Sequence, residues 1–435
     1  MTDTPKNFVI GLTGSLGSGC STLSRALESK GFKRISLSDP IKDKFRELNP
    51  GKEPTKDSFG EDWRAELQDI GNKGRQGEYI ESSVESNGSK HYDYWVDLAL
   101  KSVNSSDCDI VIDGIRNNSE VESLRKKYRH LHFWLVAVYA DYETRWERVK
   151  ERYPNEKVFK RDDLRDSDED EKFGQNVQKC VYEADFVFKN EEKIEPDSII
   201  AEKLAERLMR QVLVMKSVMK GEVSRNPLPP EVYMATAVSQ SHASRCLKRK
   251  VGALIVDENN IPLSVGYNDN PVRMESCLTL YNGQCYKDMV MESKLEKMGP
   301  LYCPKCAKKH ESLTKPWICD GNIKTEETKK PCRYNFKSNF FPSRNMELCT
   351  AIHAEERTIR SLGGRSAEGC TLYVNTFPCF QCSRYIKDAD IKKVVYVEAY
   401  PIKEAVDFLK KNGIIIEAFE GFKPRVFNQV FKQIE

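Results

Sequence analysis

Residues 8–22 read FVIGLTGSLGSGCST, a short apolar run followed directly by a glycine-rich stretch. The phosphate-loop pattern G-x-x-x-x-G-K-[ST] fits residues 14–21 at every position but one, because Cys20 stands where the lysine belongs. The glycines still allow backbone N–H groups to surround an anion at the start of a helix. A thiol cannot replace the permanent charge of lysine, which argues against phosphoryl transfer. The predicted nucleotide-binding residues are Gly14, Gly17, Gly19, Ser21 and Thr22, together with Asp113.

Outward from this loop, short apolar runs alternate with amphipathic stretches up to residue 205. This alternation predicts a parallel α/β sheet covered by helices. Asp113 ends one of the buried strands, where a carboxylate could hold Mg²⁺ beside a nucleotide. Four arginines are candidates for a lid over that nucleotide: Arg145, Arg148, Arg161 and Arg165. Strands are expected at 35–37, 109–113, 133–138 and 185–188, and helices at 21–30, 93–102, 120–127 and 142–152.

The first half of the chain resembles the P-loop nucleotide kinases. The resemblance rests on the loop, on Asp113-Gly114-Ile115-Arg116 at a strand end, and on a closing strand at 184–187. It implies a P-loop kinase-like domain over 1–210. A helix is expected over 198–219, and a linker helix over 211–230 leads to the second half. The segment RNPLPP at 225–230 breaks helicity and marks the boundary.

A metal-binding pattern dominates the second half, where His353-Ala354-Glu355 is followed by PCFQC at 378–382. A helix over 347–362 is expected to carry His353, and a strand over 371–374 leads to a second helix starting near Cys379. One imidazole and two thiolates give Zn²⁺ three ligands and leave the fourth tetrahedral position for water, whose pKa falls from about 15.7 toward about 7. Glu355 is not needed as a ligand and can shuttle protons. We therefore predict Glu355 as catalytic residue and His353, Cys379 and Cys382 as zinc ligands.

The H-x-E and P-C-x-x-C pair is the signature of zinc-dependent nucleobase deaminases, and its surroundings resemble the deoxycytidylate deaminase family. The similar stretches are SRCLKRKVGA at 244–253, GYNDNP at 266–271, AIHAE at 351–355 and TLYV at 371–374. The resemblance implies a cytidine deaminase-like α/β/α domain over 231–435. It also implies attack on C4 of a pyrimidine and contact of Asn268 with the sugar hydroxyl. Arg357, where relatives commonly carry asparagine, and residues 375–377 depart from the family, which leaves the preferred nucleotide open.

An insertion over residues 278–345 is rich in cysteine. Four thiolates could close a structural zinc site there and order a polar segment with little core of its own, with free cysteines as the equal alternative. Another alternative uses Cys246 and Cys277, which match cysteines that hold a second zinc in some phage-type relatives. The basic stretches at 247–250 and 306–309 are either solvated faces or attract a triphosphate or RNA. The four predicted thiolate ligands are Cys303, Cys306, Cys319 and Cys332.

Composition narrows the remaining possibilities. The chain has 435 residues, 39% hydrophobic and 31% charged, as in ordinary globular proteins of two or three domains. Its net charge of +3 is too balanced to argue for nucleic acid or an anionic membrane. No apolar run approaches the roughly 20 residues that cross a bilayer, and no secretory signal is evident, so a cytoplasmic protein without membrane contact is expected. Most of the 14 cysteines cluster in the second half, which favours metal thiolates over disulfides.

The fusion of these two units resembles the bacterial anti-phage dCTP deaminases, in which removal of deoxycytidine nucleotides starves viral DNA synthesis. The resemblance implies zinc-dependent conversion of dCTP and dCMP to dUTP and dUMP by a homo-oligomer. The first unit would then sense a regulatory nucleotide or a partner such as RNA. Two other functions stay open: a polynucleotide cytosine deaminase, and a nucleotide-binding regulator or kinase with a secondary deaminase site.

Overall fold

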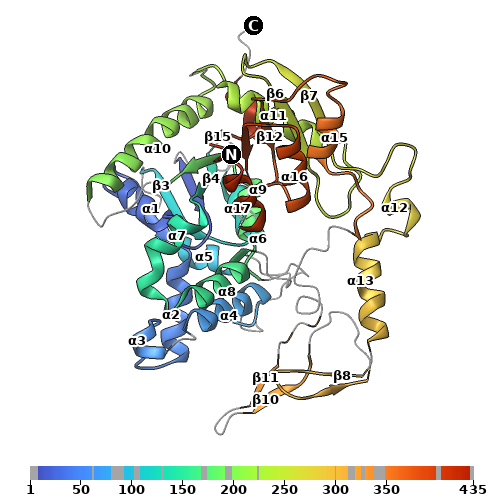
Figure 1. Ribbon diagram of the computed structural model, residues 1–435. Coiled ribbons are helices and arrows are strands. Elements are labelled where there is room, and N and C mark those ends of the chain that lie inside the picture. The colour runs from blue at the N-terminus through green and yellow to red at the C-terminus, as the bar shows by residue number, and fades with distance from the viewer. Residues whose placement is uncertain are drawn as a thin grey trace.

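Two α/β units lie side by side in the computed structural model, one built around a six-stranded sheet and the other around a five-stranded sheet (Figure 1). The predicted fold class is confirmed. The structure describes residues 8–60, 63–79, 93–101, 108–128, 132–167, 174–191, 198–222, 225–298, 300–311, 319–324, 329–332, 334, 336, 348–397 and 403–431.

The first sheet has the strand order β15-β5-β4-β1-β3-β2. Strand β1 (Val9–Thr13) lies between β3 (Ile110–Ile115) and β4 (Phe133–Tyr139) and runs parallel to both. Strands β2 (Lys33–Ser36) and β5 (Phe186–Lys189) extend the parallel sheet on either side. Every residue of β1 and β4 is buried, because helices cover both faces. This explains why these strands are continuous apolar runs in the sequence.

Helices surround this sheet, and several of them begin at a capping side chain. Helix α6, for example, begins at a capping box in which Asn117 accepts from Ser119 N while Glu120 reaches back to the Asn117 backbone. No helix among the described residues is both long and apolar enough to cross a lipid bilayer. The helices are α1 (Cys20–Glu28), α2 (Ser38–Leu48), α3 (Lys56–Phe59), α4 (Trp63–Gln76), α5 (Tyr94–Leu100), α6 (Asn118–Lys127), α7 (Tyr142–Val149), η1 (Lys150–Arg152), α8 (Glu156–Ser167), α9 (Val177–Glu183) and α10 (Ser198–Met219).

The predicted linker helix over 211–230 is wrong as a single element. Residues up to Met219 belong to α10, which buries Leu208 and Val212 on the side facing α1. The helix then ends in a turn with Gly221 at φ +79. A new helix, α11 (Pro229–Ser241), begins with proline in its first turn, where a missing N–H costs nothing.

The second sheet has the order β14-β13-β12-β6-β7. Strand β12 (Thr371–Val374), predicted from the sequence, runs antiparallel to β6 (Gly252–Val256) and parallel to β13 (Lys393–Tyr396). Strands β7 (Pro262–Tyr267) and β14 (Ile415–Ala418) form the two edges. Besides α11, the helices of this unit are α15 (Ala354–Arg360), α16 (Phe380–Asp388) and α17 (Lys403–Lys411).

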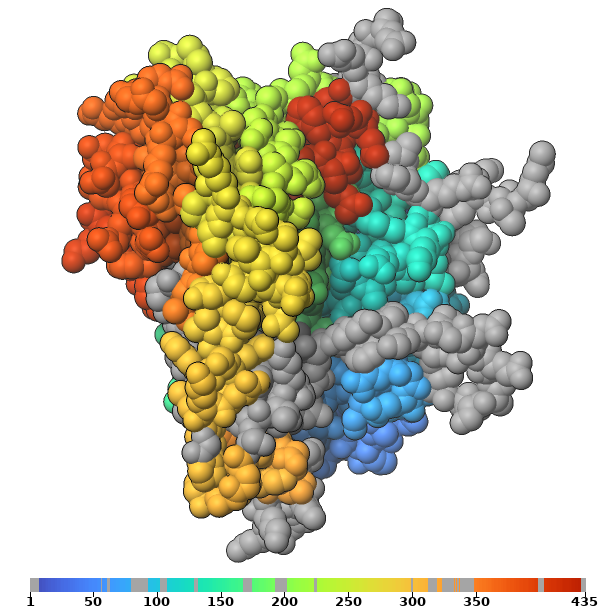
Figure 2. All heavy atoms as spheres, turned by 90° about the vertical axis from the view of Figure 1, so that its right-hand side faces the viewer, coloured from blue at the N-terminus to red at the C-terminus, as the bar shows by residue number. Residues whose placement is uncertain are grey.

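The insertion leaves the second unit after β7 and carries its own small elements. Figures 1 and 2 show it running toward the end of the molecule where α2 and α3 lie. Its described residues form two short antiparallel hairpins, β8–β9 and β10–β11. Its elements are α12 (Cys277–Leu280), α13 (Tyr286–Lys297), β8 (Leu301–Tyr302), β9 (Lys309–His310), β10 (Asn322–Lys324) and β11 (Lys329–Pro331).

The end of the chain returns to the first sheet. Strand β15 (Gly421–Phe422) pairs antiparallel with β5, and α18 (Pro424–Val430) packs into the core beside it. The fully buried Glu231 of α11 accepts a hydrogen bond from Phe422 N at 3.0 Å. The buried hydroxyls of Tyr139 and Tyr396 also form a hydrogen bond between β4 and β13. Residues assigned by sequence to the second unit, 231–435, therefore complete the sheet of the first.

Gly266 in β7 lies against α15, and a Cβ there would be 2.4 Å from Thr358 Oγ1 and 2.9 Å from Ala354 O. Because the helix backbone cannot yield cheaply, we expect Gly266→Ala to lower the free energy of unfolding by about 1–3 kcal/mol. Chemical denaturation measures this. Val265→Ala, at an exposed neighbour in the same strand, is the control and should change stability by less than about 0.5 kcal/mol. An equally small effect of both changes would contradict this close packing.

Candidate active site and metal centre

The two helices α15 and α16 bring the predicted zinc ligands together at their first residues. His353 is the N-cap of α15, and Cys379 is the N-cap of α16. The helix predicted over 347–362 is therefore too long, because it begins only at Ala354. The reason is tertiary: Ile352 forms backbone hydrogen bonds with Asp269 in both directions, at 2.9 and 3.1 Å, which keeps the preceding chain extended.

The ligand atoms of His353, Cys379 and Cys382 all lie within 4.8 Å of one another. His353 Nδ1 is 3.2 Å from Cys382 Sγ and 3.4 Å from Cys379 Sγ. Tetrahedral zinc with bonds of about 2.0 Å to nitrogen and 2.3 Å to sulfur sets these atoms about 3.5 Å apart. The donor set and its spacing fit Zn²⁺, with Nδ1 as the imidazole ligand atom.

The three side chains influence one another's protonation. The pKa of Cys379 is lowered to about 4. The hydrogen bond with Cys382 is the largest cause of this shift, and the hydrogen bond and charge of His353 act in the same direction. The same contact with Cys379, and burial, raise the pKa of Cys382 well above its usual value. Burial disfavours the charged form of His353, but the hydrogen bond to Cys379 and the charge of Glu355 raise its pKa to about 9. The cluster thus favours a thiolate on Cys379, the form that binds metal ions.

Glu355 lies in the first turn of α15, and its side chain is in contact with that of Cys382. Only 4% of Glu355 is exposed. Burial raises its pKa to about 7, while the charge of His353 acts in the opposite direction. A carboxyl group beside the ligand cluster, without being one of its three members, is placed to move protons.

Asn268, predicted to contact a sugar hydroxyl, is buried at the end of β7. Its Oδ1 accepts from Val251 N at 2.7 Å, and its Nδ2 donates to Arg249 O at 2.9 Å. Both polar ends of the side chain therefore fasten the loop that precedes β6. Contact of Asn268 with a substrate stays a prediction.

Asn375 was not singled out as a site residue from the sequence, yet it fastens the same loop from the other side. Its Oδ1 accepts from Gly252 N and its Nδ2 donates to Lys250 O, both at 3.0 Å. Because Asn375 follows β12 directly, these bonds fix the start of the segment that leads to Cys379. The position of an asparagine immediately after a buried strand is the sequence feature that could have indicated this role.

Arg357, where relatives commonly carry asparagine, takes a structural part in this unit. It donates to the carbonyl oxygens of Asp269 and Asn270, each at 3.1 Å. Arg245 holds the Asp269 carboxylate from the other side at 2.8 Å. These bonds stabilise the segment that pairs with Ile352 and thereby the approach to His353.

The glycine-rich loop of the first unit has the backbone that its sequence predicts. Gly17 and Gly19 have φ of +82 and +99, a region that favours glycine, and Gly19 is the N-cap of α1. A Cβ at Gly14 would lie 2.4 Å from Val138 O. The loop therefore needs glycine at each of these positions, and Ser21 and Thr22 follow in the first turn of α1.

Cys20 and Asp113 flank this loop. Burial raises the pKa of Cys20 to about 11, so its thiol carries no charge near neutral pH. Asp113 Oδ2 accepts from Ser24 Oγ at 2.7 Å and pairs with Arg34 at 3.0 Å. Its Oδ1 has no hydrogen-bond partner in the part of the chain that the structure describes. Binding of Mg²⁺ by Asp113, and of a nucleotide by the loop residues, stays a prediction.

The four arginines predicted as a lid are already engaged with other residues. Arg148 donates to the loop carbonyl oxygens of Gly17 and Ser18, so it braces the loop rather than covering it. The other three form ion pairs: Arg145 with Asp163 at 2.6 Å, Arg161 with Asp162 at 2.9 Å and Arg165 with Asp69 at 2.6 Å.

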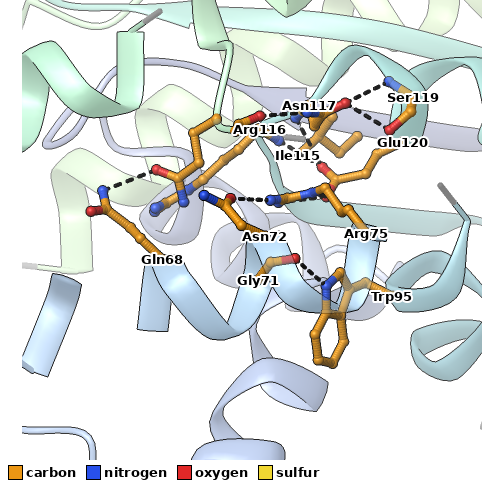
Figure 3. Close-up of polar contacts among 12 residues, drawn as sticks. Gln68, Gly71, Asn72, Arg75, Trp95, Ile115, Arg116, Asn117, Ser119 and Glu120 are labelled. Atoms are coloured by element: carbon orange, nitrogen blue, oxygen red, sulfur yellow. Dashed lines mark hydrogen bonds and ion pairs between the residues drawn. The ribbon is translucent and has the colours of Figure 1, made fainter. Parts of the chain in front are cut away.

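A buried polar network supports the end of β3, and sequence reasoning missed it. Figure 3 shows Arg75 of α4 between Asn72 and Glu120, with contacts of 3.2 and 2.9–3.0 Å. The second carboxylate oxygen of Glu120 accepts from the backbone N–H groups of Arg116 and Asn117. Because Arg75 and Glu120 are 45 residues apart, no local pattern pairs them. The network fixes the segment that follows Asp113.

Comparison with known families places both units. Residues 229–398 match the family model described as "Cytidine and deoxycytidylate deaminase zinc-binding region". Residues 10–173 match that of an AAA domain. The second unit is thus similar to cytidine and deoxycytidylate deaminases, and the first is similar to AAA domains, each over less than half of the chain. These matches agree with the two family resemblances predicted from the sequence.

Curated relatives of the chain carry the name deoxycytidylate deaminase. The protein from Saccharomyces cerevisiae is 28% identical over 43% of this chain and 43% of its own length. That of Enterobacteria phage T2 is 26% identical over 42% of this chain and 87% of its own length. The chain thus spans less than half of the yeast relative.

Solved structures resemble the two halves only distantly. A dCMP deaminase from cyanophage S-TIM5 is 21% identical, with 45% of this chain and 100% of that chain covered and a TM-score of 0.26. A shikimate kinase from Acinetobacter baumannii is 15% identical, with 48% and 94% covered and a TM-score of 0.28.

Proposed function

We propose that this chain is a zinc-dependent hydrolase that removes the exocyclic amine of dCMP and dCTP, giving dUMP and dUTP. The observation that carries the proposal is the convergence of His353, Cys379 and Cys382 beside the buried carboxyl group of Glu355. The name shared by the curated relatives supports deoxycytidine nucleotides as substrates.

In this proposal the chain's own residues hold the metal and move protons. His353 Nδ1 and the thiolates of Cys379 and Cys382 would hold Zn²⁺, which when bound supplies Lewis-acid activation of water at neutral pH. Glu355 accepts the proton that water loses and donates it to the ring nitrogen next to C4 of the pyrimidine. The water oxygen adds to C4, and the proton that remains on this oxygen passes through Glu355 to the amine. The C4–N bond then breaks, which releases ammonia and leaves a carbonyl group at C4. Asn268 would contact the sugar.

The first domain, in this proposal, binds a nucleotide as a sensor and does not transfer its phosphoryl group. The glycine loop at the start of α1 supports anion binding, and the neutral Cys20 in place of lysine supports the loss of transfer chemistry. The fused architecture supports a further role of the enzyme in lowering dCTP during phage infection.

A substrate panel tests the proposal. The full chain is incubated separately with dCMP, dCTP, CMP, CTP, cytidine and a single-stranded oligonucleotide containing cytosine, and ammonia and phosphate transfer are both measured. We expect ammonia from dCMP and dCTP and no phosphate transfer. Deamination of the oligonucleotide alone would instead support a polynucleotide deaminase. Phosphate transfer without ammonia would support a kinase, and either result would overturn the proposal.

A further inference from the structure

The insertion brings four cysteine side chains to one point, away from the site described above. The sulfur atoms of Cys303, Cys306, Cys319 and Cys332 all lie within 4.8 Å of one another. Cys303 and Cys332 are 3.6 Å apart, and Cys306 and Cys319 are 3.4 Å apart. Four sulfurs at about 2.3 Å from one zinc ion form a tetrahedron with edges of about 3.8 Å. The observed spacing is close to this value.

The first pair of cysteines lies on a tight turn between β8 and β9. Cys303 N donates to Lys308 O at 2.9 Å, and Ala307 N donates to Cys303 O at 2.8 Å, with Ala307 in the left-handed region at φ +57. The backbone N–H groups of Lys305 and Cys306 are directed at the Cys303 sulfur. Amide hydrogens aimed at a sulfur stabilise its thiolate form, which is the form that a metal ion binds.

The second pair comes from the β10–β11 hairpin and completes the cluster. Gly321 N donates to Cys319 Sγ at 3.3 Å, and Cys332 N donates to Gly321 O at 2.6 Å. A Cβ at Gly321 would lie only 2.6 Å from Cys306 Sγ and 3.2 Å from Cys319 Sγ. The glycine thus lets the two hairpins approach until their sulfurs meet.

His310 lies beside the four cysteines and contacts one of them, but it is not a fifth ligand. Its Nε2 lies 3.2 Å from Cys319 Sγ, and its Nδ1 lies 3.7 Å from Asp320 Oδ1. Among the described residues, the ligand atoms of His310 lie within 4.8 Å of those of Cys319 and Asp320 only, whereas the four sulfurs all lie within 4.8 Å of one another. Residues around a metal site commonly form hydrogen bonds to the ligands themselves. An Nε2–H of His310 that donates to the Cys319 thiolate is a contact of this kind.

Among the described residues of the insertion, few others form a core. Its core of buried residues consists of three of the four cysteines with Leu295 and Phe336. Hairpins of two and three residues per strand do not fold alone in water. The sequence also predicted Cys246 and Cys277 as an alternative pair of ligands. Among the described residues, neither belongs to a cluster of three or more potential ligands close enough to share a metal ion.

We propose that the insertion binds a second zinc ion through the thiolates of Cys303, Cys306, Cys319 and Cys332, with His310 as a hydrogen-bond donor to Cys319. This zinc ion closes its coordination sphere with protein ligands and orders the two hairpins.

Zinc content of the purified full chain tests the proposal. We expect two zinc ions per chain, and one in Cys303→Ser/Cys332→Ser, with the deaminase site still loaded. Cys285→Ser is the matched control, because Cys285 lies in the same insertion outside the cluster, and it should keep two. One zinc ion in the unaltered chain, with disulfides joining Cys303 to Cys332 and Cys306 to Cys319, would overturn the proposal.

X-ray absorption identifies the ligands. In His353→Ala/Cys379→Ala, the remaining zinc should show only sulfur neighbours at about 2.3 Å. Adding His310→Ala to this variant should leave the sulfur neighbours of the zinc ion unchanged. A nitrogen neighbour of the zinc ion in His353→Ala/Cys379→Ala would overturn the four-thiolate assignment. If the variants fail to fold, alkylation of the unaltered chain decides instead. The four cysteines should resist labelling until a chelator is added, and labelling at equal rates before and after chelation would overturn the proposal.

Discussion

Replacing Glu355 by glutamine should reduce the rate of dCMP deamination by a factor on the order of 10²–10⁴ while the zinc content stays unchanged. Glutamine keeps the size of the side chain, and Glu355 is not one of the three clustered ligands, so the metal site is preserved. The amide, however, cannot accept a proton from water or pass one to the departing amine. Steady-state ammonia release and zinc analysis on the same sample measure both effects.

Glu356→Gln is the matched control. Glu356 is the next residue of α15, and its side chain, which is 14% exposed, pairs with the exposed Arg360 at 2.7 Å. Loss of this ion pair removes a contact within α15 and no proton-transfer group, so this variant should keep its turnover. Full activity of Glu355→Gln, or equal losses in the two variants, would remove Glu355 from its assigned part.

Replacing Cys379 by serine should lower the zinc content by one ion per chain and reduce turnover to background. A hydroxyl is a much weaker zinc ligand than a thiolate. Loss of an outer-shell partner already costs about 10–100-fold in metal affinity, and loss of a direct ligand should cost more. Zinc analysis by mass spectrometry, with ammonia release on the same sample, checks this result.

Cys370→Ser separates loss of metal from the general effect of changing a buried thiol. Cys370 is 2% exposed and precedes β12. Among the described residues, it belongs to no cluster of three or more potential ligands close enough to share a metal ion. This variant should therefore keep both its zinc and its turnover.

Undiminished turnover of zinc-free Cys379→Ser would show that the reaction does not need this ligand.

Much of the architecture follows from local patterns. The alternation of apolar strands and amphipathic helices predicts the parallel core of the first sheet, because strands buried on both faces must be apolar throughout. The glycine loop and the two short metal motifs are equally local. The side chains of His353, Cys379 and Cys382 meet because each motif lies at the start of a helix that follows an extended segment.

Other features depend on partners far away in the sequence. Local propensity extends the helix before His353 too far, since it does not include the pairing of Ile352 with Asp269. A strand of two residues such as β15 has no readable period, and its place beside β5 depends on hydrogen bonds with distant residues such as Glu231. The same holds for the pair Arg75–Glu120, which joins α4 to α6. The engagement of both polar ends of Asn268 likewise requires the folded backbone.

The need for zinc beside Glu355 is tested most directly by removing the metal from the full chain and returning it in measured steps. Deamination of dCMP and dCTP should be absent from the metal-free protein and should rise in proportion to the zinc that binds at His353, Cys379 and Cys382. Cys303→Ser/Cys332→Ser is the suitable chain for this titration, because it lacks two of the four cysteines proposed to bind the second zinc ion. Undiminished ammonia release from a metal-free preparation would contradict the account.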